Sequence, residues 1–439
     1  MRWTLEDVAR ITEGTIIGDP RLVVTSVDTD SRAVTVGSLF VAVVGERFDG
    51  HRFAAAALLA GARAALVSQS PTGLSAAVVV DDTLTALLAL AKAHRRQLDG
   101  TVIAVTGSTG KTSTKDLLAG ALDGSHVSPR SYNNEIGVPL TILSAPPDAP
   151  YVVVEVGSRG VGHIEYLMPA VRPDVAVITN LGVVHLETFG TEQRLADAKW
   201  ELAAAVEPAG TVVVPEDEPR LRRPTQATVS TFGSTGTVSV KRVTTDDDGR
   251  ATFDLGYRGT TYPIALSMSG RHQPMNAAAA FAAAVAAGAP PAEVAVGLST
   301  ASGSAWRMEI HRGTFTVVND AYNANPDSMR SAIETVAAMP GRHLAILGGM
   351  AELGSVALAE HEAIGQLLAD RNYEGVIVVG EEPGIAEAYG SEAVRVVDAA
   401  GAVEAARALI RPGDVVLVKA SRSEGLETVA LELIEVATR

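Results

Sequence analysis

The chain has 439 residues, of which 47% are hydrophobic and 20% charged, a formal net charge of −15 at pH 7, and no cysteine. This composition is typical of a soluble globular protein with two or three domains, and the negative charge argues against broad binding to nucleic acid or anionic membranes. Without cysteine the chain can form no disulfide and no thiolate metal site. Its apolar runs are too short to span a membrane, and its charged N-terminus lacks the apolar core of a signal peptide, so we expect a cytoplasmic protein.

The first predicted domain, residues 1–99, is a small α/β unit. Short strands are expected over the apolar runs at 39–45, 64–68 and 76–80. A helix is expected over 83–98, which leads through Asp99-Gly100 into the next domain.

The second predicted domain, residues 100–312, contains a mostly parallel sheet. β-Branched runs at 102–105, 151–157, 174–180 and 211–215 are apolar on both faces and alternate with helical segments, which indicates a buried parallel sheet. Between residues 234 and 267 alternating strands with turn signals predict an antiparallel appendage. The alanine-rich run at 276–287 predicts a tightly packed helix.

The third predicted domain, residues 313–439, is a second doubly wound, Rossmann-like sheet. Apolar runs at 314–320, 343–349, 375–380, 394–398 and 414–421 are separated by helical segments. No G-x-G-x-x-G turn follows any of them, so the sequence does not support a dinucleotide site.

The stretch TVIAVTGSTGKTSTKDLLAGAL (101–122) is similar to a phosphate-binding loop, although Val105 stands where the pattern G-x-x-x-x-G-K-[ST] requires glycine. A strand precedes the loop and a helix follows it, so backbone N–H groups and the positive helix end can face phosphate oxygens. The alternative is an ordinary strand–turn–helix corner with an accidental Lys-Thr pair. The second glycine within the loop favours a nucleotide site for ATP, contacted by Gly107, Ser108, Thr109, Gly110, Lys111, Thr112 and Ser113.

A Mg²⁺ ion beside this loop would use the Thr112 hydroxyl and further oxygen ligands at neighbouring strand ends. Glu155 ends the next predicted strand, although a carboxylate there could also simply cap the strand. Asn180 and His185 follow the strand after that, and a lone histidine is more often a loop or core residue than a ligand. Lys199 lies on a predicted helix, and because an ammonium would be repelled by Mg²⁺, the residues alone indicate a surface lysine.

Several segments together resemble the Mur ligase family over essentially the whole chain. The central segments are TGSTGKTSTK, NNEIGVPLTIL, VVEVG, VITNLGVVHLE and AKWEL. The first domain contributes DTDSRAVTVGSLFVAVVGERFDGHRFAAAAL, and the third contributes NDAYNANPDSM, LGGMAELG and VLVKASRS. A shortened T-G-x-x-G-K-T loop is a feature of this family, which accounts for Val105. NDAYNANPDSM is similar to the members that add D-alanyl-D-alanine to UDP-N-acetylmuramoyl-tripeptide, whereas the D-N-P-R signature of the diaminopimelate-adding members is absent.

The resemblance implies roles for individual residues. Thr112, Glu155 and His185 match metal positions for two Mg²⁺ ions, and Lys199 matches a lysine that the family carbamylates with CO₂, which would make it a metal ligand. The implied catalytic residues are therefore Lys111, Glu155, His185 and Lys199. Further ATP contacts are implied for Asn276, Arg307, Asp320, Tyr322 and Asn325, although His272-Gln273-Pro274 departs from the family's usual His-Asn. Substrate contacts are implied for Ser31, Arg32, Asp49, His51, Asn133, Asn134, Asn323, Lys419 and Ser421.

The implied activity is ATP-driven amide formation through an acyl phosphate, with the first domain binding UDP, the second ATP, and the third closing with the dipeptide. We expect a monomer with no nucleic-acid partner. Two alternatives stay open: a sister or folylpolyglutamate-type ligase that adds one amino acid, and a regulator that hydrolyses nucleotide without joining anything. The sequence leaves open whether the tripeptide ends in diaminopimelate or lysine.

Overall fold

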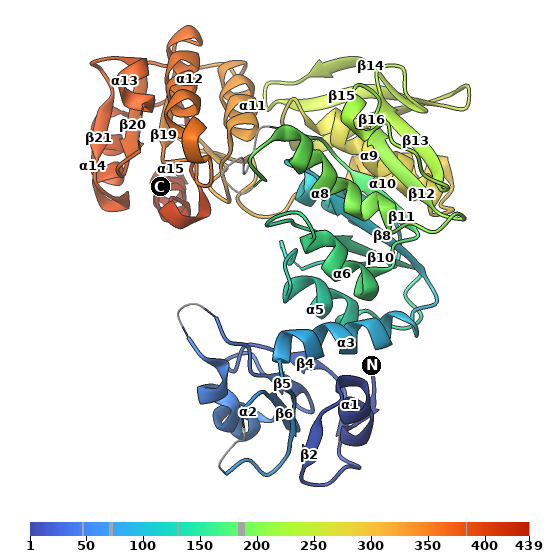
Figure 1. Ribbon diagram of the computed structural model, residues 1–439. Coiled ribbons are helices and arrows are strands. Elements are labelled where there is room, and N and C mark those ends of the chain that lie inside the picture. Colours follow the sequence, from blue (N-terminus) through green and yellow to red (C-terminus); the bar gives the residue numbers. More distant parts are fainter. Residues whose placement is uncertain (46–47, 70–72, 130, 183–188, 383, 439) are drawn as a thin grey trace.

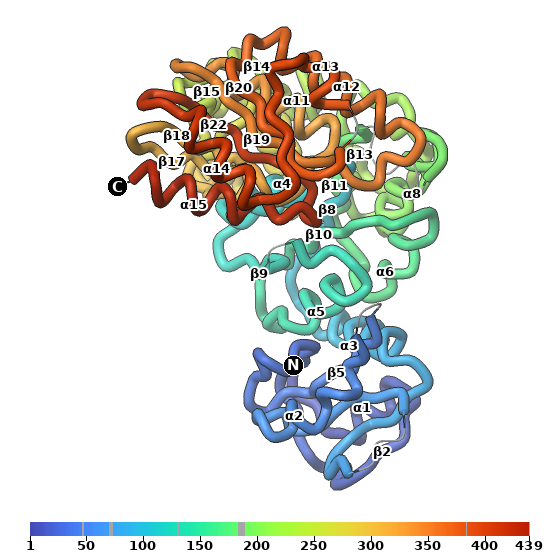
Figure 2. Tube along the Cα trace, turned by 90° about the vertical axis from the view of Figure 1, so that its left-hand side faces the viewer, coloured from blue at the N-terminus to red at the C-terminus, as the bar shows by residue number. Residues whose placement is uncertain are grey.

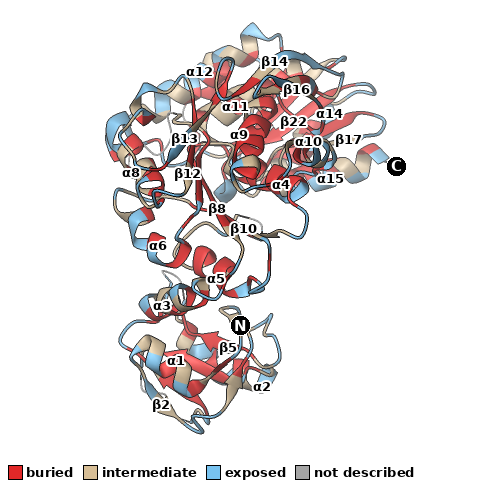
Figure 3. Ribbon diagram, turned by 90° about the vertical axis from the view of Figure 1, so that its right-hand side faces the viewer, coloured by how far each residue is buried: buried red, intermediate tan, exposed pale blue. Residues whose placement is uncertain are grey.

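The computed structural model describes residues 1–439 except 46–47, 70–72, 130, 183–188, 383 and 439. Three α/β units follow one another along the chain, with the first at one end of the molecule and the third beside the central one (Figures 1 and 2). The strands of the three sheets form the buried interior, and exposed residues lie mainly on helices and loops (Figure 3). None of the helices in the described part of the chain is long and apolar enough to cross a membrane.

The first unit has a five-stranded sheet in the order β2-β7-β6-β5-β4, with parallel pairs except β2 against β7. A short antiparallel pair, β1 (Trp3–Thr4) with β3 (Val23–Val24), lies beside it. Helix α3 packs against α5 and α6 of the central unit, so one hydrophobic core continues across both units. The bounds of its elements are β2 (Thr15–Ile17), β4 (Val27–Asp28), β5 (Leu39–Val41), β6 (Ala64–Val67), β7 (Ala77–Val79), α1 (Leu5–Thr12), α2 (Ala54–Ala60) and α3 (Thr83–Arg95).

The central unit has a nine-stranded sheet in the order β16-β15-β14-β13-β12-β11-β8-β10-β9. Its strands are β8 (Thr101–Thr106), β9 (His126–Val127), β10 (Tyr151–Glu155), β11 (Val175–Ile178), β12 (Thr211–Pro215), β13 (Thr228–Gly233), β14 (Val238–Thr245), β15 (Arg250–Tyr257) and β16 (Thr260–Ser269). The pairs from β9 to β14 are parallel, and β14, β15 and β16 pair antiparallel, which confirms the predicted appendage. The sequence did not indicate β13, which joins the appendage to the parallel strands in one continuous sheet.

Helices cover both faces of the central sheet. Their bounds are α4 (Lys111–Ala121), α5 (Gly137–Ser144), α6 (His163–Val171), α8 (Glu192–Ala204), α9 (Gln273–Ala286) and α10 (Pro291–Thr300). Helix α9 is the predicted alanine-rich helix, and residues 276–284 of it are buried between the sheet and α4. Small side chains allow this close approach, which holds α4, and the loop before it, against the sheet.

The third unit has a six-stranded sheet in the order β17-β18-β22-β19-β20-β21, parallel except for β17 against β18. Alternate residues along its strands enter two separate cores, one under α11 and α12 and the other under α14 and α15, as in a doubly wound sheet. The bounds are β17 (Glu309–Arg312), β18 (Thr316–Asn319), β19 (His343–Leu347), β20 (Gly375–Val379), β21 (Val394–Val396), β22 (Val415–Lys419), α11 (Pro326–Ala337), α12 (Ala357–Asp370), α13 (Ile385–Tyr389), α14 (Ala399–Leu409) and α15 (Glu427–Thr438).

The fold class predicted from the sequence is confirmed: three α/β units, a mostly parallel central sheet with antiparallel strands at one edge, and a doubly wound third sheet. The domain boundaries at 99/100 and 312/313 stay predictions. Strand β17 lies before the second boundary, yet it pairs with β18 in the third sheet.

Candidate functional site

The glycine loop lies between β8 and α4 at the carboxyl edge of the central sheet. Gly107 has φ +148° and Gly110 has φ +77°, a backbone region that favours glycine. A Cβ on Gly107 would overlap Thr179 Oγ1, and a Cβ on Gly110 would overlap Asn276 Oδ1. The loop is held in place from the next strand, because Thr109 N donates to Asn180 Oδ1 at 2.8 Å. Both glycines are therefore required by the geometry of the loop.

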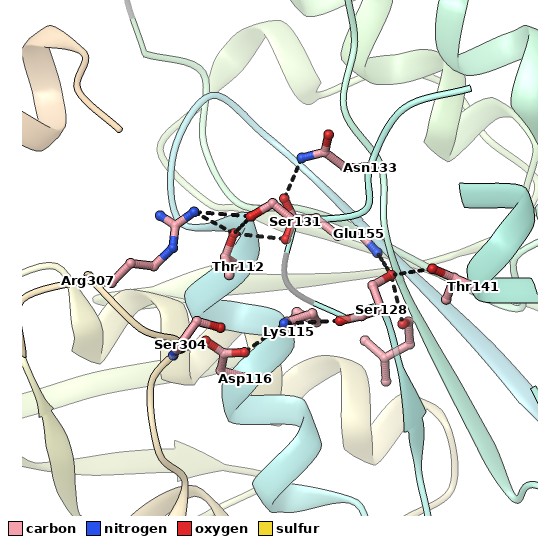
Figure 4. A network of polar contacts seen from close by, with 11 residues as sticks. Thr112, Lys115, Asp116, Ser128, Ser131, Asn133, Thr141, Glu155, Ser304 and Arg307 are labelled. Atoms are coloured by element: carbon pink, nitrogen blue, oxygen red, sulfur yellow. Dashed lines mark hydrogen bonds and ion pairs between the residues drawn. The ribbon is translucent and has the colours of Figure 1, made fainter. Parts of the chain in front are cut away.

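A polar cluster surrounds the first turn of α4 (Figure 4). Thr112 Oγ1 donates to Glu155 Oε2 at 2.8 Å, and Asn133 Nδ2 donates to Glu155 Oε1 at 2.7 Å. Glu155 is only 1% exposed, and burial of a carboxylate is costly unless it is hydrogen-bonded. The two partners, one on each oxygen, offset this cost. Ser131 Oγ lies 3.3 Å from Thr112 Oγ1. The cluster thus places hydroxyl and carboxylate oxygens directly beside the loop.

Two lysines, Lys111, which is partly exposed, and Lys199, which is buried, face this cluster. Lys111 Nζ donates to Gly107 O at 2.7 Å and to Ser108 O at 3.2 Å. Burial and the Arg307 charge lower the pKa of Lys111, and the Glu155 carboxylate partly offsets this. Lys199, on α8, is 2% exposed, and burial together with the charge of Lys111 holds its pKa well below the ordinary value. The interpretation of Lys199 as a surface lysine, drawn from the residues alone, is therefore wrong.

Arg307 enters the site from the segment that connects the central and third units. Its Nη2 donates to Thr112 Oγ1 at 3.0 Å and to Ser131 Oγ at 3.4 Å (Figure 4). Its guanidinium carbon lies 4.3 Å from the ring centroid of Tyr322, at cation–π distance. One arginine thus contacts the loop helix of the central unit and an aromatic ring of the third.

The third unit contributes a buried ion pair at the end of β22. Lys419 Nζ lies 2.6 Å from Asp320 Oδ2 and donates to Asn323 O at 2.8 Å. Burial lowers the pKa of Lys419, and the Asp320 carboxylate opposes this shift. Asn325 caps α11, where its Oδ1 accepts a hydrogen bond from Ser328 N at 2.9 Å. The motif NDAYNANPDSM therefore forms the corner between β18 and α11, with its polar side chains beside the central unit.

These groups line one cavity of about 670 Å³ between the central and third units. The metal prediction fits its donor set, because the Thr112 hydroxyl and Glu155 carboxylate are the hard oxygen ligands that Mg²⁺ takes. Within the described ranges there is no group of three or more His, Asp or Glu residues placed to hold a metal, and His185 lies outside those ranges. Mg²⁺ usually takes only one or two carboxylates and completes its shell with phosphates and water. The predicted residues that line the cavity are Ser108, Thr109, Gly110, Lys111, Thr112, Ser113, Asn133, Asn134, Glu155, Lys199, Arg307, Asp320, Tyr322, Asn323, Asn325 and Lys419.

Three family models match consecutive parts of this chain. Residues 23–95 match the Mur ligase family catalytic domain, residues 105–284 the Mur ligase middle domain, and residues 306–422 the Mur ligase glutamate ligase domain. The chain belongs to the Mur ligase family. The resemblance found in the sequence motifs is therefore confirmed.

Relatives of this Mur ligase are similar over nearly their full length. UDP-N-acetylmuramoyl-tripeptide--D-alanyl-D-alanine ligase of Mycobacterium leprae is 37% identical, covering 97% of this chain and 98% of its own. The ligase of the same name from Bacillus subtilis is 33% identical, with 98% of both chains covered. A crystal structure of MurF from Acinetobacter baumannii superposes with a TM-score of 0.91 at 30% identity, over 99% of both chains. The MurF ligase of Thermotoga maritima in complex with ADP has a TM-score of 0.82 at 30% identity, over 94% of this chain and 97% of its own.

The predicted substrate residues of the first unit of this Mur ligase do not line the cavity. Ser68 N donates to His51 Nε2 at 2.9 Å, so Nδ1 carries the proton and donates to Asp49 Oδ1 at 2.6 Å. His51 N also donates to Asp49 Oδ1 at 3.0 Å, and this bond, together with the one from the His51 ring, lowers the pKa of Asp49 and fixes the corner before α2. Arg32 pairs with Asp30 at 2.7 Å on the surface. Binding of substrate by Asp49, His51, Arg32 and the neighbouring Ser31 stays a prediction.

Three further predicted residues lie outside the cavity lining but next to it. Gly107 precedes the lining residues of the loop, and Asn276 contacts Gly110 while donating to Gln273 Oε1 at 3.1 Å. Ser421 Oγ accepts a hydrogen bond from Ala351 N at 2.8 Å, which supports the LGGMAELG segment. Their roles in binding ATP or dipeptide stay predictions.

The cavity also contains polar residues that the sequence analysis did not select. Ser131 stands two residues before the NNEIGVPLTIL stretch, and Asp327 belongs to the NDAYNANPDSM motif, so one lies next to and the other within a stretch already singled out. Arg159 and His163 enter the cavity from the segment after β10, where no motif indicated them. The remaining polar lining residues that were not selected are Ser158, His272, Gln273, Ser328, Ser331 and Glu352, while Asn180 was named beside His185 but given no role.

Proposed function

We propose that this Mur ligase uses ATP to join D-alanyl-D-alanine to UDP-N-acetylmuramoyl-tripeptide, giving the pentapeptide precursor of peptidoglycan. The observation that carries the proposal is that the glycine loop and the NDAYNANPDSM corner line the same cavity. Relatives that carry this activity in their names match along the whole chain at 31% to 37% identity. By contrast, structures of a diaminopimelate-adding ligase and a folylpolyglutamate synthase are 19% and 18% identical, a likeness of fold alone.

In the first step, a carboxylate oxygen of the tripeptide attacks the γ-phosphorus of ATP, the bond to the β-phosphate oxygen breaks, and ADP leaves. Loop N–H groups and Lys111 would hold the phosphates, and Arg307 would face the transferred group from the segment that connects the central and third units. Such chemistry depends on positioning and electrostatic stabilisation. Thr112 and Glu155 would hold Mg²⁺, which neutralises phosphate charge when bound.

In the second step, the amine of the dipeptide attacks the carbonyl carbon of the acyl phosphate and loses a proton. The tetrahedral intermediate then expels inorganic phosphate and leaves an amide. Asn323, Asn325 and Lys419 would contact the dipeptide from the third unit. Because the cavity lies between two units, their closure would exclude water that otherwise hydrolyses the acyl phosphate.

We further propose that Lys199 carries a carbamate. The nitrogen of a neutral amine forms a bond to the carbon of CO₂ and loses a proton, so the charge at this position changes from zero to negative. The support is the burial of Lys199 beside Lys111, which favours its neutral form. ATP and a UDP-linked acceptor are cytoplasmic metabolites, so we expect the enzyme to act in the cytoplasm. We also keep the expectation of a monomer.

The test is product analysis with ATP, D-alanyl-D-alanine and each UDP-tripeptide, ending in diaminopimelate or lysine. We expect a product heavier than the acceptor by one dipeptide residue, together with phosphate release that stops when either substrate is omitted. Phosphate release that continues unchanged after both omissions would favour the nucleotide-hydrolysing regulator. A product formed with a single amino acid in place of the dipeptide would favour a sister ligase.

A further inference from the structure

The linker between the central and third units, residues 302–308, is attached at its two ends to different bodies. Ser304 N donates to Asp116 Oδ2 at 2.8 Å, on α4, the helix that follows the glycine loop (Figure 4). Met308 N donates to Asp320 Oδ1 at 3.1 Å, in the third unit. The exposed Ala305 lies between these two attachments. The linker residues from 306 onward are therefore fixed to the third unit.

The part of the linker that carries Arg307 has an uncommon backbone. Trp306 has φ +61° and Met308 has φ +52°, and left-handed conformations at bulky residues are costly unless surrounding contacts hold them. Tyr322 N donates to Trp306 O at 3.1 Å, and Trp306 N donates to Glu309 Oε2 at 2.9 Å. The third unit therefore supplies the contacts that hold this backbone.

Arginine and aromatic side chains alternate along one row, which we call the arginine–aromatic ladder: Trp306, Arg422, Tyr322 and Arg307. The Arg422 guanidinium carbon lies 4.9 Å from the Trp306 ring centroid and 5.9 Å from that of Tyr322, while that of Arg307 lies 4.3 Å from Tyr322. Arg422 Nη1 lies 3.0 Å from Glu427 Oε1 on α15, which holds its guanidinium from the third unit. Guanidinium groups at these distances attract ring faces.

We propose that Arg422 is a positioning residue, which acts through the arginine–aromatic ladder to hold Arg307 at the loop end of the cavity. The proposal rests on the proposed function in that it assigns Arg307 to the phosphoryl-transfer step. Arg307 has few other supports in the described structure: Nη2 reaches Thr112 and Ser131, and its buried Nε has no partner. It also lies near the positive Lys111, so contacts with aromatic rings help keep two like charges close together.

Because the ladder belongs to the third unit, Arg307 moves with that unit and reaches the loop only when the third unit is docked. Arg422 itself is exposed and does not line the cavity. Its loss should therefore lower kcat more than it changes the KM for ATP. A misplaced reacting group costs rate steeply, and we expect Arg422→Ala to lower kcat about tenfold with the KM for ATP changed less than about threefold.

Graded variants test the ladder itself. Arg422→Lys keeps the charge but loses the planar group that stacks on rings, so it should recover only part of the lost rate. Trp306→Phe keeps a ring and should be milder than Trp306→Leu. Arg407→Ala is the matched control, because Arg407 is an equally exposed arginine of the third unit that pairs with Glu432 at 2.7 Å away from the cavity. It should retain full turnover, and an Arg422→Ala variant as active as Arg407→Ala would overturn the proposal.

A double variant decides whether Arg422 acts through Arg307. In an Arg307→Lys background, the further change Arg422→Ala should lower ATP turnover by less than about twofold. The effects of two substitutions on turnover are not additive when the two residues act through each other. A further tenfold fall would overturn the positioning role. Whether the wild-type protein forms ligated product tests the proposed function, independently of the comparison between variants. If the wild type only hydrolyses ATP, that function fails while the ratio between variants can still be measured on hydrolysis.

A second readout needs no activity. With Trp3 and Trp200 replaced by phenylalanine, Trp306 is the remaining tryptophan of the chain. Arg422→Ala should then raise quenching of its fluorescence by acrylamide by about twofold, since the stacked guanidinium no longer covers the ring. Arg407→Ala should leave it unchanged. Equal quenching in all three proteins would overturn the ladder.

Discussion

Lys199 in the central unit and Lys419 in the third are each 2% exposed and line the same cavity, yet their surroundings differ. Lys419 lies 2.6 Å from the Asp320 carboxylate, which favours its charged form. Among the described residues, no carboxylate forms an ion pair with Lys199, and burial and the charge of Lys111 lower its pKa although the more distant Glu201 opposes this shift. Equal burial therefore produces a paired cation in one unit and an amine that favours neutrality in the other.

This difference suits different chemistry. A neutral amine can react with CO₂, whereas a paired ammonium can hold a carbonyl or an anion in place. Lys419 connects Asp320 at the end of β18 with Asn323 in the following corner, so its charge also stabilises the cavity wall. Buried charged pairs are costly to break from one side only. The predictions that follow use substitutions at the two lysines to separate these roles.

The largest effect is expected for Lys199→Ala. Loss of the carbamate should lower ligation by about 10²- to 10³-fold, the range found when one preorganised electrostatic group is removed. Added acetate or propionate should restore part of the rate, because a free carboxylate can occupy the space of the missing carbamate. Ligated product is the readout, and Lys92→Ala, an exposed lysine on α3, is the control.

The modification itself can be observed without turnover. Wild-type protein in ¹³C-bicarbonate should show a carbamate ¹³C signal by NMR that is missing from Lys199→Ala. Full activity in the alanine variant, or the same signal in both proteins, would refute the assignment of Lys199.

Replacement of either lysine by methionine should change the free energy of unfolding, downward in Lys419→Met and upward in Lys199→Met. Lys419→Met leaves the Asp320 carboxylate, 13% exposed, without its cation, and should cost about 3–5 kcal/mol. Lys199→Met removes an amine whose pKa is well below its ordinary value. In protein kept free of CO₂, where Lys199 is an unmodified amine, the folded chain loses this proton at a lower pH than the unfolded chain does, so this group makes wild-type stability rise with pH toward about 10. Lys199→Met should therefore be more stable than wild type at pH 7 and show a smaller rise.

Thermal unfolding of wild type and both variants between pH 7 and pH 9 measures these effects. The wild-type protein supplies the reference slope of stability against pH over this range, and this slope should be smaller in Lys199→Met. Destabilisation of similar size in both variants would show that the two lysines are equivalent, and the contrast between them would be lost.

Much of the fold could be predicted from the sequence because buried strands of parallel sheets leave long apolar runs. The runs at 151–157 and 414–421, for example, form β10 and β22. Strand β13 was missed because its sequence TVSTFG is largely polar and exposed at its start. β13 is placed by its pairing with β12 on one side and β14 on the other, and a local sequence pattern does not report such pairing.

The site was predicted unevenly for the same physical reason. The glycine loop is local, since strand, turn and helix are adjacent in sequence, and its glycines are required where they stand. Lys199 was misjudged from the residues alone because its helix has polar residues around it, and only the packed sheet decides which face is buried. The contact of Arg307 with both Thr112 and Tyr322 depends on how the third unit docks, which only the family resemblance indicated.

The smallest expected effect is a change in the pKa of His272, which should respond to substitution of Lys419 and not of Lys199. The pKa of His272 is lowered to about 4, mainly by burial and also by the charges of Lys419 and Arg307, while the Asp320 carboxylate opposes this shift. Its Nδ1 lies 2.7 Å from Ser331 Oγ on α11, between the central and third units. In Lys419→Met one lowering charge is removed and Asp320 loses its partner, so the pKa should rise by about one.

NMR titration of the His272 ring in wild type and both methionine variants, below their unfolding temperatures, measures this rise. Lys199→Met is the control, because Lys199 is not among the charges that act on His272. Since the folded pKa lies below the ordinary value of about 6.5, the fold loses stability as pH falls from about 6.5 to about 4. The ring is partly exposed, so we expect this loss to be about 1 kcal/mol and smaller in Lys419→Met. A His272 pKa that is unchanged in Lys419→Met, or that rises equally in Lys199→Met, would show that Lys419 does not act as the charged member of the pair.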